Sequence, residues 1–277
     1  RWRNDELKMK QGLLSYENIG LHLDDGTILK KAKAKYLLSL SLQGDVTIDE
    51  LLSLLPETKT KLKDVLFKGT LALSAKANGP LDNLAAQAIV TPKGLGAEIS
   101  TNDITLSPKV NSGALIVSVN TKGDQISARG ELNPQLQLTA AGATFNISGV
   151  GKNLTKEPDL DFELNSSKIP IVQLLARLPA ELCASAAAFS PQGALTVTGS
   201  FKGSPTELDG LIDVKPSDVS ISLPVPGKTM KASIVEGCCK LKTFVRKEKT
   251  VVHALLSPVV RLKTEDASLI IKGQLKD

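Results

Sequence analysis

The sequence predicts a mainly β protein built from antiparallel strands, and three observations carry this prediction. Apolar and polar residues alternate with a period of two along most of the chain, as they do in strands with one apolar and one solvated face. Turn signals such as DDG, NGP, TKGD and KGSP separate these runs, because Gly, Pro and Asp favour tight reversals. Only two short segments follow a helical period. The pattern favours antiparallel meanders over βαβ units.

The apolar positions of the alternating runs are the candidate functional residues. If the strands join one sheet in register, these side chains line a single face, because alternate residues of a strand project to the same side. The candidates are Leu38, Leu40, Leu42, Leu71, Leu73, Leu115, Val117, Val119, Leu136, Leu138, Phe145, Ile147, Leu160, Phe162, Leu164, Leu195, Val197, Val219, Ile221 and Leu223.

The two helical segments are short and amphipathic. Their apolar residues recur with spacings of three, one and three, which predicts helices over 46–56 and 169–179. Thr47 or Asp45 is expected to cap the first helix, and Pro170 fits the first turn of the second. Pro56 and Pro179 are expected to end them.

The chain also repeats itself at an offset of about 124 residues. Beyond the helices, GTLALSAKANGPLDNL from Gly69 aligns with GALTVTGSFKGSPTEL from Gly193, so that glycines, strand leucines and a later proline coincide. We therefore expect two β repeats of about 124 residues, at 1–150 and 151–277, in one continuous body. In each repeat the short helix is expected to cover one end of the sheet.

Composition and charge argue against a nucleic-acid-binding protein. The 34 basic and 29 acidic residues give a net charge of +5 and are scattered along the chain, and aromatic residues make up only 3%. Nucleic-acid binders usually cluster Lys and Arg with stacking aromatics, so no nucleic-acid partner is expected. The densest basic stretch, LKKAKAKY, alternates Lys with Ala. It is typical of a solvated strand face, and an anionic-lipid contact is the alternative.

The sequence holds no recognisable catalytic or metal-binding motif. Cys183, Cys238 and Cys239 lack zinc-site spacing, and we expect free buried thiols, with one bridge from Cys183 as the alternative. His22 and His253 lie in alternating runs without a ligand partner. GVGKNLT lacks full phosphate-loop spacing, and neither FSPQG nor SGALI is a nucleophile elbow. We expect no enzyme activity, no cofactor and no metal.

No targeting or membrane-spanning segment is recognisable. The first ten residues, RWRNDELKMK, have no apolar core, and no window approaches the ~18 apolar residues that suggest a membrane span. We expect the chain to be a soluble portion of a longer protein.

The repeated motifs resemble those of the AsmA-like family of bacterial envelope proteins, which includes TamB-like relatives. The resemblance rests on VTIDELLSLLP and IPIVQLLARLP, on the strand-turn segments that follow them, and on LIDVKPSDVSISLP, and it is clearest between Tyr36 and Leu223. These proteins are similar to eukaryotic bridge-like lipid-transfer proteins. The resemblance implies an elongated, curved antiparallel sheet whose hydrophobic groove carries phospholipids in the periplasm. It also implies an inner-membrane anchor that this chain lacks.

Two architectures and two functions follow from these patterns. The apolar face either forms an open groove for acyl chains, as the resemblance implies, or closes as the dry core of a sandwich, because the alternation is the same in both. The open groove predicts a non-enzymatic module that binds phospholipids and supports their transport between the inner and outer membranes. The closed core predicts an envelope assembly scaffold that docks other envelope proteins through exposed sheet edges.

Overall fold

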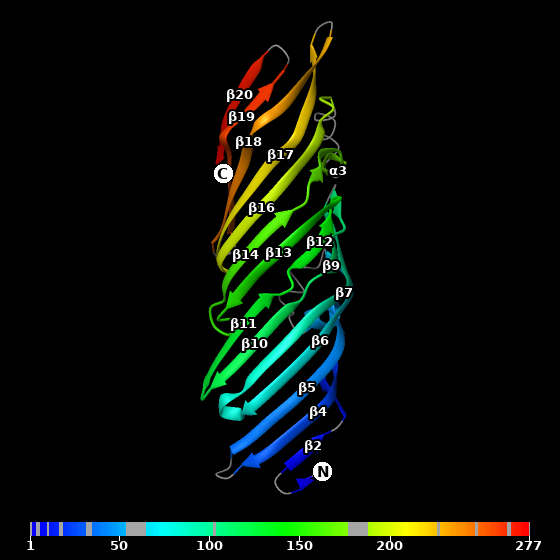
Figure 1. Ribbon diagram of the computed structural model, residues 1–277, viewed down its shortest axis with the longest axis vertical. Coiled ribbons are helices and arrows are strands. Elements are labelled where there is room, and N and C mark those ends of the chain that lie inside the picture. Colours follow the sequence, from blue (N-terminus) through cyan, green and yellow to red (C-terminus); the bar gives the residue numbers. More distant parts are fainter. Residues whose placement is uncertain are drawn as a thin grey trace. The chain divides into compact units, whose positions relative to one another are not determined.

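The computed structural model describes most of the chain. The described residues are 2–3, 6–9, 11–16, 19–31, 35–53, 65–101, 104–176, 188–225, 228–246, 249–264 and 267–276. They are mainly strand, the pairings between the described strands are antiparallel, and the strands belong to one large sheet. The predicted fold class, a mainly β antiparallel protein with short helices, is confirmed (Figure 1).

Most elements follow one another with short connections, which is typical of meanders. In chain order they are β1 (Trp2–Arg3), β2 (Glu6–Met9), β3 (Gly12–Tyr16), β4 (Ile19–Lys31), β5 (Lys35–Thr47), α1 (Ile48–Ser53), β6 (Val65–Pro80), η1 (Leu81–Asn83), β7 (Ala85–Thr101), β8 (Ile104–Leu106), β9 (Lys109–Ser112), β10 (Leu115–Lys122), β11 (Gln125–Leu132), β12 (Leu136–Ala140), β13 (Ala143–Lys152), β14 (Asp159–Ser166), β15 (Ile169–Pro170), α3 (Ile171–Leu175), β16 (Gln192–Ser204), β17 (Glu207–Val225), β18 (Lys228–Arg246), β19 (Lys249–Lys263) and β20 (Ser268–Lys276).

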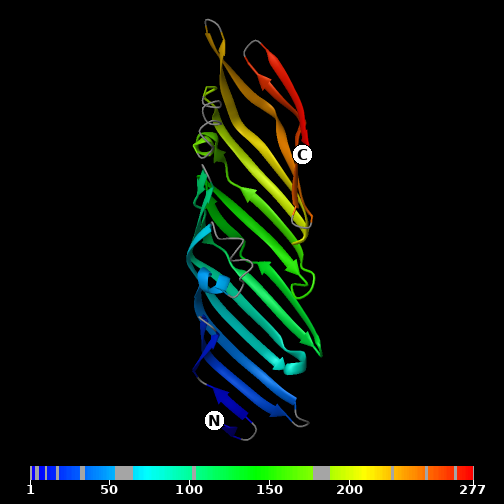
Figure 2. The same ribbon diagram turned by 180° about the vertical axis from the view of Figure 1, so that it is seen from behind.

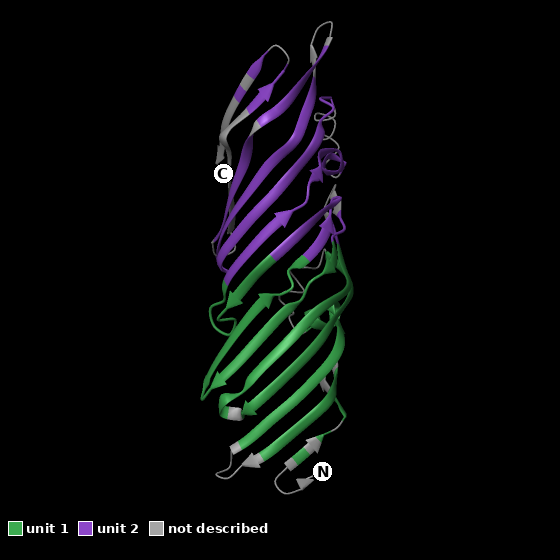
Figure 3. Cartoon of the chain, viewed as in Figure 1, with its two compact units in different colours: residues 1–97, 109–136, 148–159 green, residues 98–108, 137–147, 160–277 purple. Residues whose placement is uncertain are grey.

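The chain divides into two compact units (Figure 3). Unit 1 comprises residues 1–97, 109–136 and 148–159, and unit 2 comprises residues 98–108, 137–147 and 160–277. These bounds differ from the expected division into 1–150 and 151–277. The difference arises because β7 and β13 each contribute residues to both units.

Unit 1 is a meander of antiparallel strands. β2 and β3 both pair with β4, and β4, β5 and β6 then pair in succession. β7 pairs with β9 and β10, β10 pairs with β11, and β11 pairs with the end of β13. Every one of these neighbours is antiparallel, so residues paired across two strands project from the same face.

Unit 2 is a meander of longer strands. β14 and β15 both pair with β16, and β16 to β20 pair in succession along the chain (Figure 1). β17 and β18 each have 19 residues. Bulges interrupt the ladders within β16–β17, β18–β19 and β19–β20. Such bulges bend long strands and increase their twist.

The two predicted short helices are present but begin later than expected. α1 starts at Ile48 rather than at 46, and α3 starts at Ile171 rather than at 169. The preceding residues stay in strands because they are paired, Thr47 with Thr70 in β6 and Ile169 with Leu195 in β16. Pro170 therefore occupies the N-cap position instead of the first turn. Positions 54–56 and 177–179 of the predicted helices lie outside the described residues.

A capping box begins α1, as the sequence TIDE permits. The Glu50 backbone N–H donates to Thr47 Oγ1 over 3.2 Å, and the Thr47 backbone N–H donates to Glu50 Oε2 over 2.7 Å. The Thr47 hydroxyl also donates to Glu50 Oε2 over 2.9 Å. Together these bonds pair orphan amides of the helix start, so Thr47 rather than Asp45 caps α1. The helix contacts β5 and β6 (light blue in Figure 2).

Matching backbone conformations occur at the positions that the sequence aligns. Gly69 and Gly193 have φ values of 93° and 100°, and their partners across the hairpin, Gly94 and Asp218, have φ values of 59° and 56°. A Cβ on Gly69 would meet the Gly94 carbonyl, and one on Gly193 would meet the Asp218 carbonyl. Both hairpins therefore place a left-handed residue against a glycine at the same point.

The hairpin ends match in the same way. Gly79 and Gly203 have φ values of 124° and 129°. A Cβ on Gly79 would lie 2.6 Å from the Asn83 carbonyl oxygen, and one on Gly203 would meet the Glu207 carbonyl. Only glycine combines this conformation with so close an approach of backbone.

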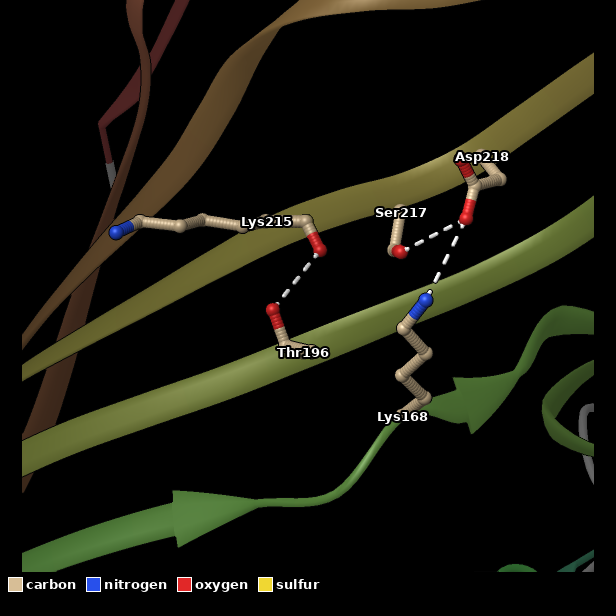
Figure 4. A network of polar contacts seen from close by, with 5 residues as sticks. All are labelled: Lys168, Thr196, Lys215, Ser217 and Asp218. Atoms are coloured by element: carbon tan, nitrogen blue, oxygen red, sulfur yellow. Dashed lines mark hydrogen bonds and ion pairs between the residues drawn. The ribbon is translucent and has the colours of Figure 1, made fainter.

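In unit 2 the left-handed residue is held by polar contacts (Figure 4). The Asp218 carboxylate accepts a hydrogen bond from Ser217 Oγ over 3.2 Å and lies 3.4 Å from Lys168 Nζ. Nearby, Thr196 Oγ1 donates to the Lys215 carbonyl over 3.4 Å. Asp tolerates the left-handed region better than most residues. The ion pair itself is exposed and contributes little.

We predict that Gly69→Ala destabilises the protein by about 2 kcal/mol, because Ala is strained at positive φ and its Cβ would meet the Gly94 carbonyl. The matched control is Gly94→Asn in the same hairpin, where φ is 59° and nothing lies within 4 Å of the added Cβ. Urea unfolding followed by circular dichroism measures both. Equal midpoints for the two variants would contradict the close approach of the Gly94 carbonyl to Gly69.

We also predict that the capping box stabilises α1 in a pH-dependent way. The backbone and hydroxyl hydrogen bonds from Thr47 lower the pKa of Glu50 below its ordinary 4.5. A lowered folded-state pKa gives a stabilisation that is present above the unfolded value and lost as the pH falls through the folded one. Amide hydrogen exchange of residues 48–53 should therefore quicken relative to Glu50→Gln as the pH drops below 4.5.

The control for this prediction is Thr47→Ala, which removes the hydroxyl that caps the helix at any pH and costs about 1 kcal/mol. If Thr47→Ala leaves the exchange of residues 48–53 unchanged, the cap does not stabilise α1.

Candidate functional site

The predicted apolar residues of β5 and β6 share one face. Leu38, Leu40 and Leu42 pair with small residues of β6, namely Gly79, Ala77 and Ala75. Leu71 and Leu73 pair in the same register with Val46 and Gly44. Since directly paired residues of antiparallel strands project to the same side, all five predicted leucines line the same apolar strip.

The predicted residues of β10 form a second strip in unit 1. Val117 pairs with Ala88 of β7 and with Gly130 of β11, and Val119 pairs with Ala86 and Ala128. Leu115 pairs with Val90 and Leu132. Larger aliphatic side chains on one strand thus alternate with Ala and Gly on its neighbours. The side chains of Leu154 and Leu115 lie over Gly130, next to Val117.

The β12–β13 hairpin orients further predicted residues. Gln137 Nε2 donates to Asn146 Oδ1 over 3.2 Å, so these two polar side chains lie on one face. Their strand neighbours Leu138, Phe145 and Ile147 project from the other face, because side chains alternate along a strand. Leu136 has the same parity in β12 and is also half-buried.

The predicted residues of β14 and β16 form the apolar face of unit 2. Phe162 pairs with Phe201, while Leu160 and Leu164 pair with Gly203 and Gly199. Leu195 and Val197 continue this face and pair with Pro216 and Val214 of β17. The face therefore extends across at least three strands in register.

The bulge at Asp218 keeps the end of β17 on this face. Before the bulge the even-numbered residues Pro216 and Val214 lie on it, and after the bulge Ser220 pairs with Gln192 on the opposite side. The odd-numbered residues Val219 and Ile221 then occupy the apolar face, and Leu223 has the same parity. The change from even to odd apolar positions in the sequence is thus compensated by one extra backbone residue.

These apolar side chains are half-buried rather than sealed in a core. Among the predicted residues whose side chains are described, only Val219 is buried, at 4% exposure, and Leu115 is exposed at 37%. The protein exposes 17931 Å², whereas a compact globular protein of 29.4 kDa exposes roughly 11,500 Å². Within the described residues the apolar face therefore lacks the complete burial of a sandwich core.

The buried apolar residues gather partly where the helices meet the sheet. Val46, at 7% exposure, lies just before α1, and Ile169 and Ile171, at 6% and 9%, flank the start of α3. Gln173 of α3 also lies directly over Gly142 in the β12–β13 turn, beside buried Ala143. Each helix thus begins beside buried apolar residues of the sheet.

The opposite face of each unit is polar and carries shallow hollows. In unit 1 a hollow of about 730 Å³ is lined mainly by polar residues of β4 to β7, including His22 and the ion pair between Lys93 and Asp45 at 2.8 Å. In unit 2 a hollow of about 400 Å³ is lined by residues such as Lys202 and Asp209. Both hollows are lined by acidic and basic side chains, so neither hollow favours a ligand of one charge.

Cys238 and Cys239 are half-buried rather than buried, and they form no disulfide with each other. Cys239 pairs with Val214 and Leu256 on the apolar face, and burial, with the neighbouring Cys238 as a smaller cause, raises its pKa. Adjacent strand residues project to opposite sides, so Cys238 faces away from it. Cys183 and the side chain of His253 lie outside the described residues. Across the described chain no three His, Cys, Asp or Glu side chains converge as a metal site.

Sequence reasoning missed much of the apolar face of unit 2. Phe201, Ile212 and Val214 join it from β16 and β17, and Leu241 joins it from β18 by pairing with Ile212. In β18 two register shifts between Ile234 and Cys238 break the alternation that would have revealed the strand. The missed residues of β18 can be identified only from their pairing with β17, a strand that the alternation does predict.

Comparison with protein-family models, curated proteins and solved structures finds no match. In the part of the chain that the structure describes, no helix has the length and apolar character needed to cross a membrane.

Proposed function

We propose that this chain is a non-enzymatic lipid-carrying module that holds phospholipid acyl chains against its apolar face. The observation that carries the proposal is the half-exposed aliphatic face of each unit, of which Leu40 and Leu73 in unit 1 and Val197 in unit 2 are members. An acyl chain laid on this face completes the burial of these side chains and of its own methylenes. Each methylene removed from water contributes up to about 0.8 kcal/mol.

The composition of the face suits movement of the ligand along it. Aliphatic contacts are nondirectional and offer no single strong point of attachment, and only 3% of the chain is aromatic. Acyl chains would therefore slide between equivalent positions while the polar headgroups stay at the rim. The two short helices, at α1 and α3, would limit the face at one end of each repeat of about 124 residues.

The resemblance to AsmA-like proteins supplies the biological setting of the proposal. In that setting the face belongs to an elongated, curved groove in the periplasm, and the module supports phospholipid transport between the inner and outer membranes. A membrane anchor would lie in a part of the protein outside this chain, and other envelope proteins would be further partners.

The first test is native mass spectrometry of the gently purified chain, combined with lipid extraction. We expect phospholipid in stoichiometric amounts, because the face is apolar and uncovered. Folded protein that carries no lipid would favour the assembly scaffold, in which an exposed sheet edge docks partner strands.

A second prediction separates the two faces of one strand. Val117→Asp places a charge between Ala88 and Gly130 on the apolar face, whereas Ser118→Asp places it opposite Arg129 on the polar face. We expect Val117→Asp to lower lipid capture at least about tenfold and Ser118→Asp to retain it, since an unpaired carboxylate against an acyl chain loses its hydration.

Circular dichroism of both variants checks that they fold. Equal lipid capture by two folded variants would refute the assignment of the ligand to this face.

A further inference from the structure

Polar side chains stand at one end of the apolar face along the strands β5, β6, β7 and β10 of unit 1. Along most of each strand the pairings place only aliphatic residues and glycine on this face. At the end beside η1 the face instead carries Tyr36 of β5 and Thr121 of β10. Figure 2 shows η1 (cyan) and α1 (light blue) at opposite ends of these strands. The face therefore changes from polar to apolar in the direction from η1 to α1.

The register fixes Tyr36 on the apolar face. Tyr36 pairs with Lys30 of β4, in the same unbroken ladder in which Leu38 pairs with Ile28. Since residues two apart in a strand project to the same side, Tyr36 lies on the face that carries Leu38 and Leu40. Its side chain is 38% exposed, and β5 contacts η1. An exposed phenol, with an apolar ring and a polar hydroxyl, thus stands at the η1 end.

The hydroxyl of Thr121 serves the backbone at the same end. Thr121 Oγ1 accepts a hydrogen bond from the Leu84 N–H over 2.8 Å, and the Thr121 N–H donates to the Leu84 carbonyl over 2.9 Å. These bonds attach β10 to the residue that follows η1. Thr121 thus has a structural role, which leaves Tyr36 for contact with a ligand.

Small residues leave a furrow that begins beside Tyr36. On β6 the face presents Gly79, Ala77 and Ala75, which pair with leucines of β5. On β7 the residues that pair with the two valines of β10 are alanines. Farther from η1, β6 presents the larger Leu73. The furrow therefore runs along the strands, with larger aliphatic side chains at its sides and at the end toward α1.

The end of the face toward α1 is more deeply buried. Val46 of β5 pairs with Leu71 and is 7% exposed. Ala114, which precedes β10 at this end, is also 7% exposed. A polar headgroup placed there would lose hydration without a polar side chain of these four strands to replace it. The η1 end, with the exposed Tyr36, suits a headgroup better.

We propose that Tyr36 orients the bound lipid, so that the ester groups of a phospholipid lie at the η1 end and its acyl chains run along β6 toward α1. This inference rests on the proposed function and adds a direction to it. The ring of Tyr36 contacts the first methylenes, and its hydroxyl donates a hydrogen bond to an ester oxygen. Tyr commonly takes this place where apolar and polar surroundings meet.

The first test locates both ends of a lipid bound to the full chain. The probes are two phosphatidylcholines that carry a nitroxide on one acyl chain, either next to the ester group or next to the methyl end. Paramagnetic broadening of the backbone amide signals shows which residues lie beside each label. We expect the ester-end label to broaden Leu38 and Gly79 most strongly, and the methyl-end label to broaden Val46 and Leu71.

The second test compares Tyr36→Leu with Tyr36→Trp. Leucine keeps an apolar contact but has no polar group, whereas tryptophan keeps both an apolar ring and a hydrogen-bond donor. We expect Tyr36→Leu to capture lipid but to reduce the difference in broadening between the two labels about threefold, and Tyr36→Trp to retain that difference. Circular dichroism checks that both variants fold.

The outcomes separate the orientation from the proposed function. A reversed order of the two labels, or equal broadening of both ends by both labels, would overturn the orientation while lipid capture itself would stand. An unchanged difference between the labels in folded Tyr36→Leu would remove the role of Tyr36. A folded chain that captures neither labelled lipid would remove the proposed function itself.

Discussion

The alternation of side chains along an antiparallel strand is the constraint on which this structure depends. A slip of one residue would move every apolar side chain of a strand to the other face. In a strand as long as β17, with 19 residues, twist and curvature make such a slip hard to avoid. The left-handed residue Asp218 absorbs one position and returns Val219 and Ile221 to the apolar side. Each unit keeps one apolar face because its strands keep this alternation of side chains in register.

Because the apolar face is only half-buried, the fold gains less stability from burial than a globular protein with a closed core. A globular core hides its aliphatic groups from water, whereas here Leu40, Val117 and Val197 keep part of their surface exposed. The ladders of backbone hydrogen bonds must then hold the strands together, and exposed ion pairs such as Lys93–Asp45 add little to them. A ligand that covers the apolar face would supply the burial that a second sheet gives elsewhere.

The sequence predicted the strands well because their alternation survives locally. It also predicted both helices, but extended them backward over residues such as Thr47 and Ile169, whose pairing to distant strands overrides their local pattern. β18 escaped the prediction because register shifts divide its apolar residues between two parities. The hollow beside the Lys93–Asp45 ion pair has no signal in the sequence, since residues of β4 to β7 come together there only in the folded chain.

The adjacent thiols of Cys238 and Cys239 give the protein an internal reporter pair. They are consecutive in β18 and project to opposite faces of the same strand, with Cys239 between Val214 and Leu256. Local backbone motion exposes both to a reagent in the same way, so it cancels in the ratio of their modification rates. A change in that ratio when lipid is added therefore reports a ligand on the apolar face.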